Sequence, residues 1–466
     1  MIKSRIFCIF LSLLLLVAPL SVSAEVGQVD IADTNGCHSV DAAKMLSPSD
    51  KMTDTARAVV MYELNSGTML YTWNPDAKIY PTSMVKLMTA LVALEKGNLD
   101  DEVTVTRKVL DELPIGIVSA GLKYNEVISL RDLLYCTMVA SANDASIVIA
   151  NHIAGSTADF VQMMNEKAEQ IGCKGTHYSD VNGLHNENTY TTARDICRLI
   201  EVALQNEIFR EMFETATYTV PATNKSEERK ITTTNHMMNE KNKKYYDERV
   251  TGDKTGATDE GGRCLALTAE VDDMQILCVV MGAQPTVEED GTISAHGSFE
   301  ESKILLDYAF KTYEPRQVFY SGQTVTQYPV VGGAHDVVTQ PAASIMTILP
   351  RDLDDSQIKW VHQQTSSNIT APVQQGDKLG VIQAWYGDKC LAQTDLVAMN
   401  HVPQYQAPII PEKPQTQGGG DGWVVVLWII GGIVLVVVLA FLALVFVRNV
   451  RVMKHRRRNR RRRDRA

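Results

Sequence analysis

The chain has 466 residues, of which 45% are hydrophobic, so it is long enough to form two domains with hydrophobic cores. Its formal net charge is −10, but residues 448–466 contribute +10 and residues 1–24 contribute +2, which leaves −22 on residues 25–447. This acidic balance argues against nucleic acid as a partner. The sequence contains neither His-Glu-x-x-His nor Cys-x-x-Cys, so nothing in it supports a zinc site, and we expect no metal or cofactor.

The first 24 residues have the pattern of a secretory signal peptide. Lys3 and Arg5 form a basic head, residues 6–20 are apolar, and Val22-Ser23-Ala24 is a small-residue cleavage site. An uncleaved membrane helix is less favoured because the apolar stretch is short. Residues 25–50 form a polar leader. Cys8 is removed with the signal, and the odd number of cysteines that remains does not suggest a disulfide framework.

Residues 51–315 are expected to form an α+β domain, in which helices pack on a mostly antiparallel sheet. A hairpin opens it, a set of helices follows, and three strands and a last helix close it. The helix starts are marked by N-cap residues, including a Ser298–Glu301 capping box. The expected strands are 58–62, 68–71, 249–256, 264–270 and 275–281, and the expected helices are 83–97, 129–140, 145–154, 156–172, 192–204 and 298–313.

The C-terminal part of the chain changes character after Pro315. Residues 316–402 show short β-rich runs broken by Gly and Pro, which predict a small all-β domain. A Pro- and Gly-rich linker, 403–422, leads to a transmembrane helix at 423–447 and a basic cytoplasmic tail at 448–466. The basic tail is expected to keep to the cytoplasmic side, which would place the α+β domain outside a cell membrane that the chain crosses once. No Leu-Pro-x-Thr-Gly precedes the span, so a wall-sorting signal is not favoured.

Three short motifs carry the chemistry. The first is Ser83-x-x-Lys86 at the head of an apolar helix, where residues three apart share one face. A serine hydroxyl is a poor nucleophile and needs a base, and a lysine can be that base when its pKa is lowered. The second is Ser141-x-Asn143, and the third is Lys254-Thr255-Gly256 on an expected strand. A second Ser-x-Asn at Ser366 follows the third motif and is a decoy.

In this order the motifs are a known signature of penicillin-binding proteins and β-lactamases. Residues 50–402 resemble the D-alanyl-D-alanine carboxypeptidases, the low-molecular-mass penicillin-binding proteins, with further similar segments at 180–184, 191–195 and 234–236. The resemblance implies removal of the terminal D-alanine from peptidoglycan stem pentapeptides and covalent inhibition by β-lactams. The chemistry that fits these residues has Ser83 as nucleophile, Lys86 as base and Ser141 as proton relay.

The other motif residues are expected to bind the substrate. Asn143 would hydrogen-bond the substrate backbone, and Lys254 and Thr255 would hold its terminal carboxylate. Gly256 would let the substrate lie close to the strand edge. By resemblance, the backbone N–H groups of Ser83 and Ala257 would form the oxyanion hole.

Several alternatives remain open on sequence alone. Ser141 could be a helix N-cap, Asn143 a turn residue and Lys254 a solvated strand residue. A β-lactamase is disfavoured because the chain lacks Glu-x-x-Leu-Asn. A DD-endopeptidase shares every motif, and a catalytically silent wall-binding protein would keep the fold. Oligomeric state and the role of the β domain stay open. His177, His185 and His236 are interpreted as scaffold residues, and Asp144 as a structural helix-start residue.

Overall fold

The computed structural model describes residues 50–111, 113, 117–406 and 422–463. The expected signal peptide, almost all of the polar leader and most of the linker lie outside the described residues. The chain up to Tyr405 and the chain from Gln406 onward form separate units and are described separately.

A five-stranded antiparallel sheet is the centre of the first part of the chain, and its strand order is β2-β1-β9-β8-β7. The predicted hairpin and the three later strands are confirmed, and the hairpin pairs with the last of those strands. β7 lies at one edge of the sheet, so one side of this strand has no partner within it. The bounds are β1 (Ala58–Glu63), β2 (Thr68–Trp73), β7 (Val250–Thr258), β8 (Gly262–Val271) and β9 (Met274–Ala283).

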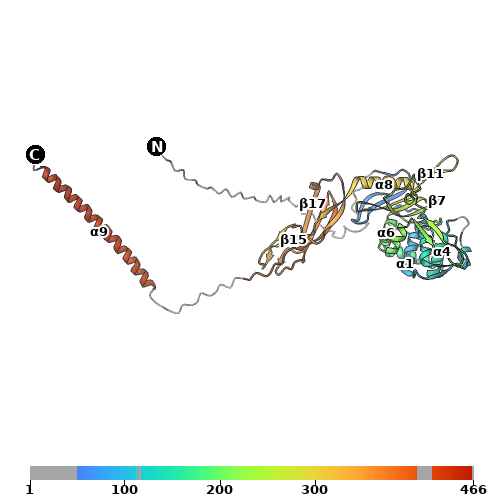
Figure 1. Cartoon of the computed structure of the whole chain (residues 1–466), viewed down its shortest axis with the longest axis horizontal. Helices are drawn as coiled ribbons and strands as arrows, with labels where there is room; N and C mark the ends of the chain where they lie inside the picture. Colours follow the sequence, from blue (N-terminus) through green and yellow to red (C-terminus); the bar gives the residue numbers. More distant parts are fainter. Residues whose placement is uncertain (1–49, 112, 114–116, 407–421, 464–466) are drawn as a thin grey trace. The chain divides into compact units, whose positions relative to one another are not determined.

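Helices cover both faces of this sheet (Figure 1). The larger core lies on the face of α1, whose residues Val85 to Ala93 are all buried, and the smaller core lies under α8. Ser156 and Thr192 cap the helices that follow them, as predicted, and the structure shows a further cap at Ser129. The helices are η2 (Thr82–Met84), α1 (Val85–Lys96), α2 (Arg107–Asp111), α3 (Leu130–Met138), α4 (Asn143–Ala154), α5 (Thr157–Gln170), α6 (Ala193–Ala203), α7 (Glu207–Glu214), η3 (His236–Met238) and α8 (Ser298–Thr312).

The predicted capping box before α8 is wrong. The N-cap residue is Gly297 at φ 61°, and no side chain caps the helix. Glu301 does not reach back along α8, because its carboxylate accepts hydrogen bonds from the backbone N–H groups of Thr55 and Ala56. A tertiary contact with the segment just before β1 has therefore replaced the local cap.

Short two-stranded pairs complete this part of the chain. One of them, β5–β6, lies immediately before the segment that leads into η3. The pairs are β3 (Glu102–Thr104) with β4 (Val127–Ser129), β5 (Thr217–Val220) with β6 (Arg229–Thr232), and β10 (Thr286–Val287) with β11 (Ile293–Ala295).

The β-rich part begins directly after α8. β12 (Tyr313–Phe319), which the sequence analysis missed, pairs antiparallel with β16 (Ile345–Pro350). A five-stranded sheet has the order β13-β15-β20-β19-β17, and the predicted β-rich runs all fall on strands. The remaining bounds are β13 (Gln327–Tyr328), β14 (Val330–Val331), β15 (Val337–Pro341), η4 (Asp355–Gln357), β17 (Ile358–Gln364), β18 (Ile369–Thr370), β19 (Lys378–Tyr386) and β20 (Lys389–Ala398).

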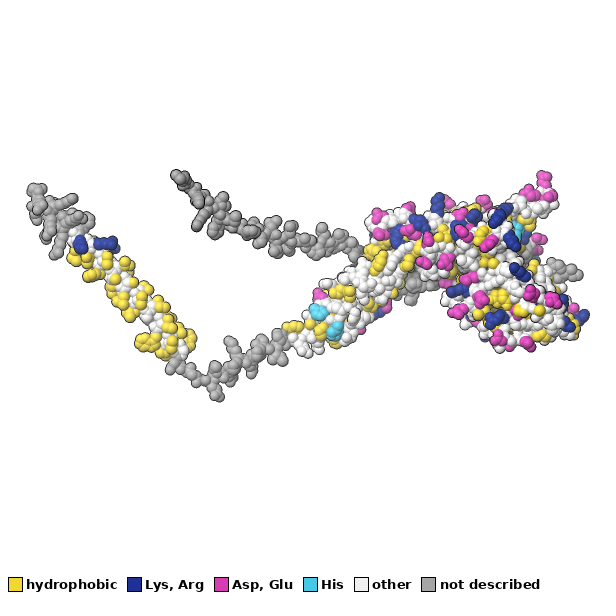
Figure 2. All heavy atoms as spheres, in the orientation of Figure 1, with side chains coloured by type: hydrophobic (Ala, Val, Ile, Leu, Met, Phe, Trp, Pro, Cys, Tyr) yellow, Lys and Arg dark blue, Asp and Glu magenta, His cyan; other side chains and the backbone are white. Residues whose placement is uncertain are grey.

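The C-terminal unit is one long helix, α9 (Gly422–Arg463). Its segment Gly422–Lys454 is long and apolar enough to cross a membrane, and it contains the predicted span. Hydrophobic side chains cover this helix, with Lys and Arg near one end (Figure 2). The helix is therefore a candidate membrane anchor.

Candidate active site

The first motif lies where η2 passes into α1. Ser83 is in the 3-10 turn and Lys86 is in the first turn of α1, so the two side chains share one face. The Lys86 Nζ lies 3.1 Å from the Ser83 Oγ. It also donates to Asn143 Oδ1 at 2.9 Å and to the carbonyl of Asn182 at 2.5 Å. A neutral amine has two N–H groups and one lone pair, so these two acceptors leave the lone pair for the Ser83 hydroxyl.

The environment of Lys86 favours that neutral amine. The side chain is fully buried, and burial lowers the pKa of Lys86 well below its usual value. The nearby charge of Lys254 lowers this pKa further, while Asp180 and Asp144 oppose the shift. Desolvation is the largest of these effects.

The second motif lies at the start of α4. Ser141 is outside the helix at φ 57°, a left-handed conformation that is unusual for a residue with a side chain. The N-cap is Ala142 and α4 begins at Asn143, so Ser141 is neither the cap nor the first residue of the helix. Asn143 has a partner at each end of its amide, because Oδ1 accepts from Lys86 and Nδ2 donates to the Val118 carbonyl at 2.8 Å.

The third motif lies on β7, the edge strand. The Lys254 side chain is 1% exposed, and its Nζ donates to Ser141 Oγ at 2.9 Å and to the Thr255 carbonyl at 3.0 Å. Burial lowers the pKa of Lys254 to about 8, and Asp253 opposes the shift. Lys254 is therefore not a solvated strand residue, and it joins the second motif to the third.

Two glycines allow the nucleophile turn to pack against its neighbours. A Cβ on Gly256 would lie 2.0 Å from the Thr82 Oγ1 and 2.9 Å from the Ser83 backbone nitrogen. A Cβ on Gly183, which has φ +80°, would lie 1.8 Å from the Thr82 carbonyl oxygen. The turn that carries Ser83 is thus held between β7 and the loop of Asn182 and Gly183. The segment 180–184 was noticed in the sequence, but the sequence did not reveal that its carbonyl binds Lys86.

A buried carboxylate fixes the loop beside Asn143. Asp144 is fully buried and accepts hydrogen bonds from the Ser119 hydroxyl at 2.6 Å and from the N–H groups of Ala120 and Leu122. The structural role predicted for Asp144 is confirmed, but its partners lie more than twenty residues earlier in the chain.

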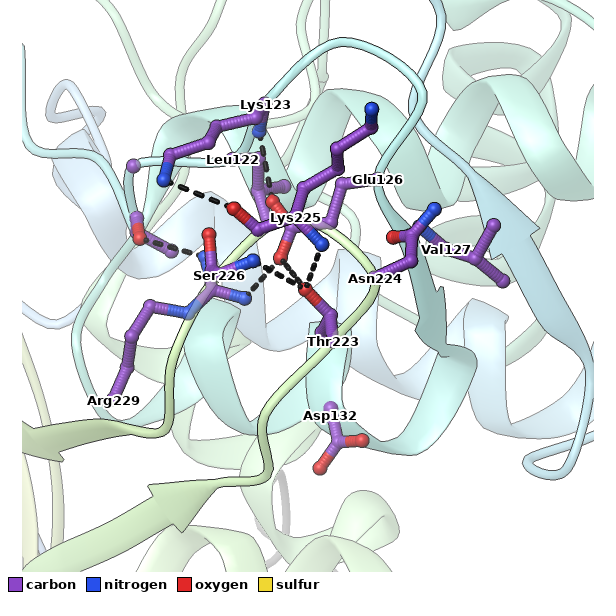
Figure 3. Close-up of polar contacts among 12 residues, drawn as sticks. Leu122, Lys123, Glu126, Val127, Asp132, Thr223, Asn224, Lys225, Ser226 and Arg229 are labelled. Carbon is purple, nitrogen blue, oxygen red and sulfur yellow. Dashed lines mark hydrogen bonds and ion pairs between the residues drawn. The ribbon is translucent and has the colours of Figure 1, made fainter.

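A second buried carboxylate ties the same loop to the β5–β6 pair (Figure 3). Glu126 is fully buried, and its Oε1 accepts from the guanidinium of Arg229 at 2.6 Å and from the Thr223 hydroxyl at 2.8 Å. The other oxygen accepts from the Lys123 backbone N–H at 2.8 Å. Glu126 therefore anchors one wall of the site, a role that sequence reasoning missed.

The three motifs converge on one cavity of about 220 Å³. Ser83, Ser141 and Thr255 line it together with Gly256 and Ala257, whereas Lys86 lies beneath it. Residues that the sequence analysis did not assign also line it, and His236 is among them although it was interpreted as a scaffold residue. These additional residues are Val118, Thr234, His236, Arg263, Cys264, His296, Ser298 and Phe299. His177 and His185 do not line it.

Metal ligands do not gather anywhere in the part of the chain that the structure describes. No three His, Cys, Asp or Glu side chains among those residues are placed to hold an ion. Among the cysteines described, Cys136, Cys173, Cys197, Cys264 and Cys278 are buried free thiols. The arrangement is suited to nucleophilic catalysis by a serine, with a buried amine as base.

The chain is similar to known proteins in both sequence and fold. Residues 44–285 match the family model described as D-alanyl-D-alanine carboxypeptidase, peptidase family S11, and residues 313–404 match the C-terminal domain of penicillin-binding protein 5. The chain is similar to a crystal structure of penicillin binding protein 5 from Haemophilus influenzae, with a TM-score of 0.61 and 27% identity over 77% of this chain and 100% of that one.

Two curated relatives differ in the activity that they are named for. D-alanyl-D-alanine carboxypeptidase DacF of Bacillus subtilis is 29% identical over 361 residues, 75% of this chain and 86% of the relative. A D-alanyl-D-alanine endopeptidase of Pseudomonas aeruginosa is 31% identical over 227 residues, 48% of this chain and 71% of the relative. Since the family model spans more than half of the sequence and includes all three motifs, the chain belongs to the D-alanyl-D-alanine carboxypeptidase family, peptidase family S11.

Proposed function

We propose that this protein is a serine D-Ala-D-Ala carboxypeptidase that removes the terminal D-alanine from peptidoglycan stem pentapeptides and is acylated by β-lactams. The proposal depends on the position of the buried Lys86 amine, which lies 3.1 Å from the Ser83 hydroxyl. The other two partners of this amine, Asn143 Oδ1 and the Asn182 carbonyl, are both hydrogen-bond acceptors. Family membership supplies the substrate class.

Acylation begins when the Ser83 oxygen attacks the carbonyl carbon between the two D-alanines. Lys86 accepts the hydroxyl proton as the new C–O bond forms. The amide C–N bond then breaks, and the proton that Lys86 took from Ser83 passes through the Ser141 hydroxyl to the leaving amine, which leaves Lys86 neutral again. The charge of Lys254 on Ser141 favours this transfer, since Lys254 Nζ and Ser141 Oγ are 2.9 Å apart. Water next attacks the acyl-enzyme, with Lys86 again as base, and releases the shortened peptide.

Two backbone N–H groups are proposed to hold the oxyanion. They belong to Ser83 and Ala257, and the close approach of Gly256 to the Ser83 nitrogen brings the two segments together. Loss of one such donor typically raises a barrier by about 3 kcal/mol. The free edge of β7 offers the peptide backbone a strand to pair with. Asn143, which was expected to bind that backbone, is buried and already has a partner at each end of its amide.

The test is mass spectrometry of a stem pentapeptide incubated with the full-length chain. The expected product has lost one alanine, and Ser83→Ala should abolish both this product and the mass adduct that benzylpenicillin forms on the protein. An unchanged pentapeptide would contradict the proposal. If penicillin also failed to label the protein, a catalytically silent wall-binding protein would be favoured.

Endopeptidase action is a second candidate, supported by the relative in Pseudomonas aeruginosa that is named for it. A cross-linked muropeptide dimer distinguishes the two activities, because only an endopeptidase converts it into monomers. Rapid turnover of nitrocefin instead of slow acylation would favour a β-lactamase.

Helix α9 is proposed to anchor the protein in the cell membrane in a single pass. The residues after the apolar segment are rich in arginine, which favours the cytoplasmic side and leaves the catalytic domain outside. Protease added to intact spheroplasts should digest the catalytic domain and spare the basic tail. Digestion of the tail alone would reverse the topology.

A further inference from the structure

A carboxypeptidase must recognise the free carboxylate of the last residue, and the cations beside the cavity differ in their ability to do so. Lys86 is fully buried and has three hydrogen-bond partners. Lys254 is 1% exposed and directs its amine to Ser141 and to a backbone carbonyl. Both amines are thus engaged with the machinery that moves protons.

Arg263 also lines the cavity, and unlike Lys86 and Lys254 it is not engaged in hydrogen bonds to the catalytic residues. Its side chain makes no hydrogen bond or ion pair with any residue that the structure describes, and it is only partly buried. A guanidinium remains charged at physiological pH and offers a planar fork of donors that matches a carboxylate. An arginine at a cavity wall with no counter-charge is a site prepared for an anion.

The register of the sheet places Arg263 beside the substrate strand. Arg263 on β8 is directly opposite Ala257 on β7, so their side chains share a face of the sheet. Thr255 is two residues before Ala257 and lies on that same face. Lys254 and Gly256 belong to the opposite face, toward Ser141 and Thr82. Ala257 is exposed, and it lines the cavity together with Thr255 and Arg263.

Hydroxyl groups complete this subsite. The Thr255 and Thr234 hydroxyls are hydrogen-bonded to each other, and both residues line the cavity with Arg263 and Ser298. Burial lowers the pKa of His296, and the charges of His236 and Arg263 lower it further. His296 therefore favours its neutral form and does not compete for the anion.

We propose that Arg263 binds the terminal carboxylate of the substrate, with Thr255 as its hydroxyl partner, and that Lys254 serves proton transfer and not carboxylate recognition. This assignment rests on the proposed carboxypeptidase function for its substrate. It replaces the expectation, drawn from sequence, that Lys254 holds the carboxylate. Arg263 is then the residue that makes the enzyme prefer free chain ends.

The test compares an N-acyl-D-Ala-D-Ala ligand with its C-terminal amide on the full-length chain. Binding is measured in a Ser83→Ala background by calorimetry, and turnover is measured with Ser83 present. Arg263→Gln should weaken binding of the free acid about 10- to 100-fold, equivalent to about 1.4–2.8 kcal/mol, and leave binding of the amide unchanged. Arg263→Lys should restore part of the preference, because it keeps the charge but not the fork.

Arg107→Gln is the matched control, since Arg107 is exposed and lies over the exposed Tyr124 ring. It should leave the preference for the acid intact. An acid-to-amide ratio that survives Arg263→Gln would overturn the inference even if the enzyme releases D-alanine. Conversely, a carboxylate preference that depends on Arg263 in a protein without turnover would uphold the inference and contradict the proposed function.

Discussion

Lys254→Met should change the pH dependence of stability in a direction that follows from burial. Burial lowers the pKa of Lys254 to about 8 in the folded protein, from an ordinary value of 10.5 that the unfolded chain keeps. Between these values the unfolded state binds more protons, so the contribution of Lys254 to the free energy of unfolding becomes more favourable as pH rises. The buried charge costs about 3 kcal/mol at pH 7 and about 1 kcal/mol at pH 9.5.

The wild type should therefore gain about 2 kcal/mol relative to Lys254→Met between pH 7 and pH 9.5. The hydrogen bonds lost with Lys254 do not alter this difference, provided that their contribution is the same at both pH values.

Urea unfolding of the full-length chain in detergent, at both pH values, measures the change. Lys230→Met is the control because Lys230 is an exposed strand residue. Stability curves for wild type and Lys254→Met that stay parallel across this range would refute the reasoning, since Lys254 would then titrate as a solvated lysine.

Two further substitutions test the supports of the site. Gly183→Ala and Gly155→Ala both place a side chain at positive φ, but only Gly183→Ala puts a Cβ against the Thr82 carbonyl. Gly183→Ala should therefore slow acylation by fluorescent penicillin by about 100-fold, and Gly155→Ala should not. Equal acylation rates for the two variants would argue that Gly183 does not help to position Ser83. Glu126→Ala should cost about 3–5 kcal/mol in urea unfolding because it leaves Arg229 unpaired. Asp100→Ala, which removes the exposed partner of Arg131 at 3.9 Å, should lower the free energy of unfolding by less than about 1 kcal/mol. Equal losses in the two variants would show that the buried Glu126–Arg229 pair contributes no more to stability than the exposed Asp100–Arg131 pair.

Local sequence was sufficient for features that depend on neighbouring residues. The Ser83–Lys86 spacing and the caps at Ser156 and Thr192 were predicted and are found. These features depend on backbone geometry over a few residues, which the sequence encodes directly. The apolar span at the C-terminus is of the same kind, because its length and composition alone define it.

Other features were decided by contacts between distant segments. Ser298 and Glu301 satisfy the pattern of a capping box, yet Glu301 binds the backbone N–H groups of Thr55 and Ala56 instead, and the buried N–H of Ala56 needs an acceptor. The β12 strand was missed because its pairing partner lies about thirty residues later.

The sequence by itself determined the fold class, the order of the three motifs and the nucleophile–base pair. Only the tertiary structure decided that the Asn182 carbonyl is a partner of the base and that Ser141 is held outside its helix. It also decided that Lys254 and Arg263 lie on opposite faces of one sheet. The reason is physical: spacing fixes which side chains share a helix face, but strand register and burial fix which charge meets which partner.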